Sequence, residues 1–143
     1  DFTLTGKPDR IDRLDDGRLY LIDYKTGTPP TKPQQKHFDK QLFLTAAMAE
    51  SGAFKGLEPS EVAKLSYVGL KAELDIETSD LEPGEVAEVW AEFGRLMASY
   101  ARLNQGYTAR RALESVRNAS DYDHLSRFGE WDMTDDPAPE ELS

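Results

Sequence analysis

The sequence lacks cysteine, has no apolar run near 18 residues, and carries fewer basic than acidic residues. The absence of cysteine excludes a cysteine-ligated metal centre and fits a reducing compartment. The absence of a long apolar run and of a signal-peptide pattern argues against membrane insertion and secretion, so we expect a cytoplasmic protein. No Walker motif is present, so the sequence shows no signature of a nucleotide-driven motor.

A β-hairpin is predicted near the start of the chain. Residues 18–25 have the composition of a strand, and residues 9–14 form its upstream partner. Because Pro8 cannot donate to a ladder, it should mark the start of that partner, an edge or a bulge. Side chains alternate along a strand. One face of the second strand therefore carries Leu19, Leu21, Asp23 and Lys25, and the other carries Tyr20, Ile22 and Tyr24.

The register of this hairpin depends on the length of its loop. A two-residue loop, 16–17, and a three-residue loop, 15–17, are both possible. A three-residue loop typically ends in a left-handed residue, usually glycine, and Gly17 stands there. It also pairs Ile11 with Leu21, an apolar residue with an apolar residue. We therefore prefer the three-residue loop.

The preferred register places Asp9 opposite Asp23, with Cβ atoms about 4.5–5.5 Å apart, where like charges are destabilising. A cation between them removes the repulsion. Mg²⁺ suits the pair because it typically takes one or two carboxylates together with phosphate oxygens and water. Lys25 points to the same face, where an ammonium stabilises charge on a phosphate. The alternative is a surface hairpin in which Asp9 is solvated and Asp23 pairs with Lys25.

Several motifs occur in a fixed order: Gly6-Lys7-Pro8-Asp9-Arg10-Ile11-Asp12, then Asp23-Tyr24-Lys25-Thr26-Gly27, then Gln41-Leu42. As a set they resemble the RecB-type branch of the PD-(D/E)xK nuclease superfamily. Within it they are similar to the C-terminal nuclease domain of the AddB subunit of AddAB helicase–nucleases, in a cysteine-free form. The resemblance runs from Thr3 to about Trp131. It implies an α/β, restriction-endonuclease-like core, with a mixed β-sheet, a site-bearing hairpin and flanking helices.

The resemblance also implies site roles. Asp9 and Asp23 would bind Mg²⁺ or Mn²⁺, and the backbone carbonyl of Tyr24 would be a further ligand. Lys25 would be the catalytic lysine and Gln41 the helix glutamine near the site. All four side chains, those of Asp9, Asp23, Lys25 and Gln41, are therefore candidate catalytic groups.

Two departures from the family pattern matter. The family often has a tyrosine four residues after the glutamine, where Thr45 stands. It also has an acidic or histidine residue on a helix before the first strand, and this chain starts too late to contain it. Many members carry an iron–sulfur cluster, which is impossible here without cysteine. The start on strand-like sequence, without Met, suggests a piece of a longer protein, and leaves open whether that piece is active alone.

The negative charge is unevenly distributed. Residues 1–50 hold 8 basic and 8 acidic residues, whereas residues 51–143 hold 9 basic and 19 acidic residues and supply the whole net charge of −10. Acidity weakens non-specific attraction to phosphate. We therefore expect the domain to receive DNA from a partner or from other domains of its own chain, with no membrane contact. The resemblance implies that the partner is an AddA-like helicase–nuclease subunit.

Periodicity predicts the remaining elements. A helix is expected over 37–51, with Phe38 on its apolar stripe and Gly52 as its C-cap signal, then a core strand over 63–70 and a long helix over 83–105. The stripe of the long helix is expected in the core: Val86, Val89, Trp90, Phe93, Leu96, Met97 and Tyr100. Weak candidates for DNA contacts are Lys32, Lys36, Lys40, Arg110 and Arg111, with a solvated surface as the alternative.

We expect a nuclease domain over residues 1–131 and an acidic, disordered tail over residues 132–143. The predicted function is Mg²⁺-dependent hydrolysis of single-stranded DNA, of the exonuclease type, within a helicase–nuclease complex for recombinational double-strand break repair. One alternative is a catalytically silent DNA-binding or scaffold module of the same complex. Another is a stand-alone nuclease, against which the acidic surface argues.

Overall fold

The computed structural model describes residues 2–71, 74–103, 105, 130, 132 and 134. Compactness divides the chain into two units, Asp1–Met97 and Ala98–Ser143, and the sheet belongs to the first. The elements are, in order, β1 (Arg10–Arg13), β2 (Leu19–Lys25), α1 (Lys32–His37), α2 (Gln41–Glu50), β3 (Val62–Leu70), β4 (Leu74–Asp80) and α3 (Glu85–Tyr100). The predictions for Arg110, Arg111 and most of the segment 132–143 lie outside the described residues.

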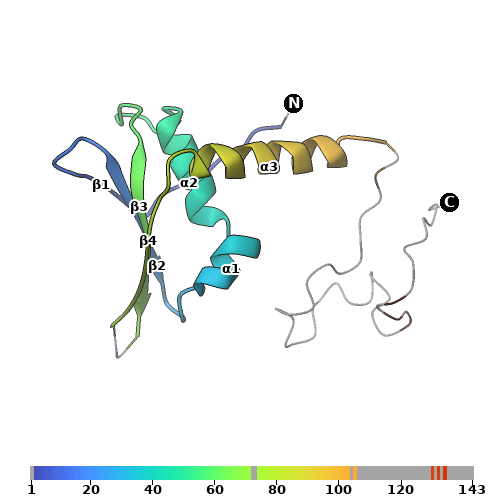
Figure 1. Cartoon of the computed structure of the whole chain (residues 1–143), viewed down its shortest axis with the longest axis horizontal. Helices are drawn as coiled ribbons and strands as arrows, with labels where there is room; N and C mark the ends of the chain where they lie inside the picture. The colour runs from blue at the N-terminus through green and yellow to red at the C-terminus, as the bar shows by residue number, and fades with distance from the viewer. Residues whose placement is uncertain are drawn as a thin grey trace. The chain divides into compact units, whose positions relative to one another are not determined.

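A mixed four-stranded sheet forms the centre of the first unit, with the strand order β1-β2-β3-β4. The β1–β2 and β3–β4 pairs are antiparallel, and the central β2–β3 pair is parallel. A parallel pair needs a long crossover, and α1 and α2 supply it. Figure 1 shows α1, α2 and the start of α3 on one side of the sheet. The predicted α/β class with a mixed sheet is confirmed.

The hairpin has the predicted three-residue loop. Ile11 pairs with Leu21, and the Leu14 N–H donates to the Arg18 carbonyl at 2.8 Å. Gly17 has a φ of +88°, a conformation that a side chain would strain. The preferred register is therefore confirmed over Arg10–Arg13 and Leu19–Ile22, and it fixes which β2 side chains face the helices, while Asp9 lies just outside the paired residues.

The hydrophobic core lies between the sheet and the helices. Leu19 and Leu21 of β2 are completely buried on the helix side, and each such side chain contributes about 1.5–3 kcal/mol. They pack in one cluster with residues from α2, β3 and α3: Leu42, Phe43, Ala46, Ala49, Val62, Leu65, Tyr67, Val86 and Val89. Asp23 follows on the same buried face of β2, so the core ends at a carboxylate.

The single helix predicted over 37–51 is two helices. α1 begins five residues before the predicted start, and α2 begins at Gln41. Local capping explains α1, because the Gln34 side chain accepts the Thr31 N–H at 2.8 Å. Phe38 lies between the helices and is 52% exposed, so its predicted place on the buried stripe is wrong. The predicted role of Gly52 is supported by its φ of +76°.

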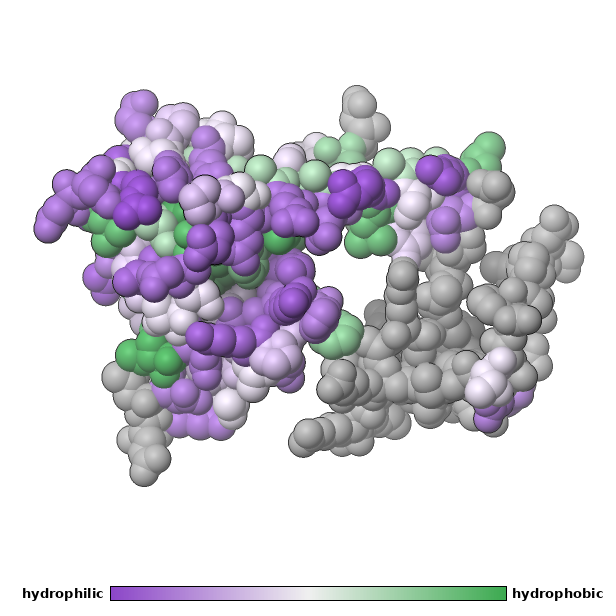
Figure 2. Space-filling model, viewed as in Figure 1, coloured by the Kyte–Doolittle hydropathy of each residue, from purple (hydrophilic) through white to green (hydrophobic). Residues whose placement is uncertain are grey.

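Two features at the end of the first unit also differ from the predictions. β4 is absent from the elements predicted above. Its acidic residues disfavour a strand, although the segment begins with the alternation of apolar and polar residues that strands show. In α3, Val86 and Val89 are buried, whereas Trp90 is 45% and Leu96 43% exposed. Figure 2 shows hydrophobic side chains at the surface along α3. The expectation that the whole stripe is core is therefore wrong.

None of the helices in the described part of the chain is long and apolar enough to cross a membrane.

Candidate functional site

Three side chains form a closed set of contacts at the end of β2. Asp23 and Lys25 lie on its helix-side face, and Gln41 is the first residue of α2. Gln41 Nε2 donates to Asp23 Oδ1 at 2.7 Å, and Lys25 Nζ donates to Gln41 Oε1 at 2.8 Å. Lys25 Nζ also lies 2.8 Å from Asp23 Oδ2. The amide of Gln41 therefore orients the carboxylate with its donor and the ammonium with its acceptor.

Asp23 is 6% exposed, so its carboxylate has lost most of its water. The Lys25 ammonium balances the charge, but its approach to Oδ2 lacks hydrogen-bond geometry, and that buried oxygen has no hydrogen bond within the described residues. The opposite charge at 2.8 Å compensates this oxygen in part, so the group is one half of a buried ion pair rather than an unpaired buried charge.

Asp9 lies at the edge of the hairpin, one residue before β1. Its carboxylate accepts the Tyr24 N–H at 2.9 Å. The alternating hydrogen-bond pattern of β1 and β2 would place Tyr24 opposite Pro8, and Pro8 has no N–H to give to the Tyr24 carbonyl. The Asp9 carboxylate and the Tyr24 backbone therefore meet at one edge, next in sequence to Asp23.

Tyr67 also contacts the site, although the sequence places it only in a core strand. It lies in β3, in register with Asp23, and is 2% exposed. Its hydroxyl donates to Asp39 Oδ1 at 2.7 Å and accepts the Leu42 N–H at 3.4 Å. Burial, and then the bond to Asp39, raise the pKa of Tyr67 well above its ordinary value. The signal for this role is general: a buried tyrosine needs a partner for its hydroxyl.

The lysines predicted as weak DNA contacts precede Gln41 in the chain. Lys32 and Lys36 are exposed on α1. Lys40 is half-buried, and its Nζ lies 5.2 Å from the centre of the Phe43 ring, within the range of a cation–π contact. Two of the three lysines are thus open to solvent, as contacts to a phosphate backbone require.

The donors near β2 fit Mg²⁺ better than a metal held by protein alone. The described part of the chain contains no group of three or more His, Cys, Asp or Glu residues that could hold a metal ion. The candidate oxygen donors are Asp23 Oδ2 and the Asp9 carboxylate, which accepts the N–H of the residue after Asp23. Mg²⁺ usually takes one or two carboxylates and completes its shell with water and phosphate. The buried Asp23 oxygen has no hydrogen bond and favours a cation beside it, and in the structure that cation is the Lys25 ammonium at 2.8 Å.

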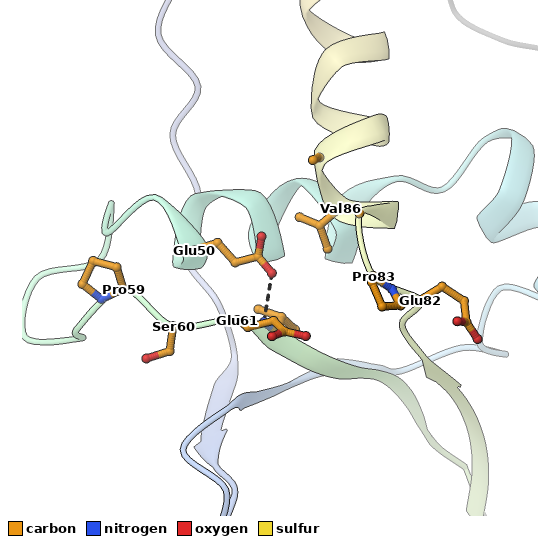
Figure 3. Close-up of a pocket in the computed structure, with 10 residues that line it drawn as sticks. Glu50, Pro59, Ser60, Glu61, Glu82, Pro83 and Val86 are labelled. Carbon is orange, nitrogen blue, oxygen red and sulfur yellow. Dashed lines mark hydrogen bonds between the residues drawn. The ribbon is translucent and has the colours of Figure 1, made fainter.

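Two pockets in the first unit differ in their suitability for an anionic substrate. The larger, of about 550 Å³, includes Glu50, Glu61 and Glu82 in its lining, and Glu50 accepts the Val62 N–H at 2.9 Å (Figure 3). Its carboxylates repel phosphate. The smaller, of about 240 Å³, lies beside Gln41. Its other lining residues are Leu4, Thr5, Gly6, Lys7, Leu44, Thr45 and Met48.

Comparison with known proteins gives one family. The sequence model of the PD-(D/E)XK nuclease superfamily matches residues 1–130. No curated protein matches the chain. The matched range contains the hairpin and α2, and therefore every residue of the contact set that joins Asp23, Lys25 and Gln41.

Proposed function

The chain belongs to the PD-(D/E)XK nuclease superfamily, and on that premise we propose that it hydrolyses phosphodiester bonds in single-stranded DNA, with Mg²⁺ or Mn²⁺. The observation that carries the proposal is the contact set of Asp23, Lys25 and Gln41. It holds a buried carboxylate and an ammonium in a fixed relation, beside further oxygen donors. Metal-assisted phosphate hydrolysis uses such a combination.

Each residue has a stated task in the proposed reaction. Asp23 presents a negatively charged oxygen that has no hydrogen bond. Lys25 keeps its ammonium beside that carboxylate, where it stabilises negative charge that develops on the phosphate. Gln41 orients both side chains before substrate arrives, so little reorganisation is needed during the reaction. Asp9 fixes the backbone at Tyr24 through its hydrogen bond.

Asp9, Asp23 and the carbonyl of Tyr24 are the groups that would hold the divalent ion. When bound, the ion supplies charge neutralisation at the phosphate and an activated water. Lys25 remains the fixed positive charge of the protein at the site. The exposed side chains of Lys32 and Lys36 are the proposed contacts for the phosphates that flank the cleaved bond.

The wider setting is proposed from the resemblance to AddB nuclease domains. The domain would act as an exonuclease of a cytoplasmic helicase–nuclease complex in recombinational double-strand break repair. An AddA-like subunit would feed it single-stranded DNA. The net charge of −10 supports delivery by a partner, because an acidic domain captures DNA weakly by itself.

A catalytically silent module of the same complex is the second candidate. The 2.8 Å ion pair between Asp23 and Lys25 favours it, because the lysine balances the buried charge without a metal. Under this alternative the contact set holds α2 to the sheet, and removing either charge affects folding rather than cleavage.

The test compares two site variants with two matched controls in the complete protein. Asp23→Ala and Lys25→Ala remove the paired charges of the site. Asp12→Ala removes a carboxylate paired with Arg10 at 2.8 Å, and Lys64→Ala removes an ammonium paired at 3.3 Å with a carboxylate of β4. Cleavage of labelled single-stranded DNA is measured with Mg²⁺, with Mn²⁺ and with a chelator.

The proposal predicts metal-dependent cleavage by the wild type and by both controls, and its loss in both site variants. Thermal unfolding of every variant is measured on the same preparations. Wild-type protein that does not cleave DNA with either metal contradicts the nuclease and supports the silent module. Cleavage by Asp23→Ala and Lys25→Ala at the wild-type rate contradicts the assigned site.

A further inference from the structure

Tyr67 contacts the site from a third element, β3. It pairs with Asp23 in the parallel register of β2 and β3 and is almost completely buried. A phenylalanine would fill the same core position without a hydroxyl that needs a partner. The hydroxyl therefore needs an explanation other than packing.

The hydroxyl of Tyr67 bonds on both sides of Gln41. It donates to Asp39, two residues before Gln41, at 2.7 Å, and accepts the N–H of Leu42, one residue after it, at 3.4 Å. The first N–H groups of a helix have no partner within the helix. The N-cap of α2, Lys40, provides no side-chain hydrogen bond, and the first turn has no acidic residue. Tyr67 therefore serves as a cap for α2 from another element.

The ring of Tyr67 contacts Lys25, the cationic member of the site. Lys25 Nζ lies 5.3 Å from the centre of the ring, within the range of a cation–π contact. The ammonium is thus held by three groups: the carboxylate of Asp23, the amide oxygen of Gln41 and this ring. The ring of Tyr67 therefore contacts Lys25, and its hydroxyl fixes the start of the helix that carries Gln41.

We propose that Tyr67 is a positioning residue for the nuclease site, which sets the placement of Lys25 and Gln41 relative to Asp23 by its ring and its hydroxyl. The inference rests on the proposed function, because it concerns the reaction of that site. Tyr67 itself touches neither substrate nor metal. Loss of its hydroxyl should therefore slow the reaction step and leave DNA binding unchanged.

The test compares Tyr67→Phe with Tyr20→Phe in the complete protein. Tyr20 is a matched control because its hydroxyl donates to Ser66 Oγ at 2.7 Å, on the face of β2 that points away from α2. We measure the cleavage rate at saturating single-stranded DNA, the Kd for that DNA without metal, and thermal unfolding. Tyr67→Phe should lower the rate about 10- to 100-fold with Kd unchanged, whereas Tyr20→Phe should retain the wild-type rate.

A readout that does not depend on activity is the hydrogen exchange of the Leu42 amide. Tyr67→Phe should speed this exchange, and Tyr20→Phe should leave it unchanged. If Tyr67→Phe does not fold, Asp39→Ala replaces it, because it removes the acceptor of the same hydroxyl at a half-buried position. It should slow cleavage in the same way.

The outcomes separate this inference from the function on which it rests. Active wild type, inactive Asp23→Ala and a Tyr67→Phe rate equal to that of Tyr20→Phe overturn the positioning role alone. Equal slowing of cleavage by both tyrosine variants also overturns it, because the slower rate then comes from losing any buried tyrosine hydroxyl of the sheet and not from the position of Tyr67. Wild-type protein without metal-dependent cleavage overturns both.

Discussion

The two faces of β2 contain polar groups that are satisfied in different ways. On the face opposite the helices, Tyr20 donates to Ser66 Oγ at 2.7 Å, and Ser66 Oγ lies 2.6 Å from Thr78 Oγ1. These neutral hydroxyls satisfy one another across three strands. On the helix side, Asp23 keeps a charge at 6% exposure, with one oxygen that has no hydrogen bond.

The difference separates a structural polar network from a candidate site. A hydrogen-bonded network of neutral groups favours one arrangement of the strands over others at little cost in free energy. A buried ion pair contributes little net stability, and apolar replacements for such pairs are often neutral or stabilising. Substitutions on the helix side of β2 that keep the shape of the paired side chains should therefore alter chemistry more than stability, whereas removing one charge outright leaves its partner unpaired and also costs stability. On the opposite face, substitutions should alter stability and leave the chemistry unchanged.

Asp23→Asn should give the largest effect, and on activity alone. The amide keeps the shape of the side chain and still accepts the bond from Gln41, but it carries no charge to hold a cation. Cleavage should fall about 100- to 1000-fold. The free energy of unfolding should change much less than it would for Asp23→Ala, because the amide keeps the packing and the partly exposed Lys25 regains water. Cleavage and urea unfolding are measured on one preparation, and joint loss of both would make Asp23 a structural residue.

Gly69→Ala should disturb the same face through the backbone. A Cβ on Gly69 would lie 2.9 Å from Pro29 Cδ and 3.3 Å from the Gly27 carbonyl, and the loop that contains both follows Lys25 directly. We expect a loss of about 1–3 kcal/mol in unfolding free energy and slower cleavage. Gly27→Ala is the control, since its Cβ meets nothing within 4 Å. If Gly69→Ala has the free energy of unfolding of the wild type, the loop shifts to accommodate the new Cβ without cost.

Ser66→Ala tests the opposite face. Ser66 is completely buried, and its loss leaves the hydroxyls of Tyr20 and Thr78 without their shared partner. Both are half-buried, so the cost should be about 1 kcal/mol, at the low end for an unsatisfied group. Thermal unfolding should shift while the cleavage rate per folded molecule stays at the wild-type value. A lower rate at unchanged stability would contradict the division between the two faces.

Local sequence was sufficient for the hairpin and its register. Gly17 determined the loop length, and the pairing of Ile11 with Leu21 followed from it. The predicted faces of β2 followed in turn, because alternation is a local rule. The contact between Asp9 and the Tyr24 N–H was not predictable in this way, since it depends on where Pro8 ends the ladder.

Contacts between distant segments were not predictable. The start of α2 was missed because Phe38 has the periodic position of a buried residue, although the chain turns there and exposes it. The hydroxyl of Tyr67 meets Asp39 across 28 positions of sequence, and no local pattern indicates that partner. Gln41 was placed near the site by family resemblance, because its spacing alone favours a surface residue.

An effect confined to high pH concerns Tyr20 and Tyr67, which lie on opposite faces of the sheet in β2 and β3. Burial, and then the hydrogen bond to Asp39, raise the pKa of Tyr67 above the ordinary 10.0. The raised pKa contributes to the free energy of unfolding in full below pH 10. This contribution falls as the pH rises toward the folded-state pKa, because the unfolded chain then releases a proton that the folded protein keeps. The slope for one proton is at most about 1.4 kcal/mol per pH unit.

The stability difference between wild type and Tyr67→Phe should therefore be constant from pH 7 to pH 9 and shift in favour of the variant above pH 10. Urea unfolding at several pH values measures it, and other titrating groups cancel in the comparison. The same series with Tyr20→Phe shows whether the shift belongs to the helix side of the sheet. A constant difference up to pH 11 would mean that water reaches the Tyr67 hydroxyl, and the contact that fixes the start of α2 would then be open to solvent.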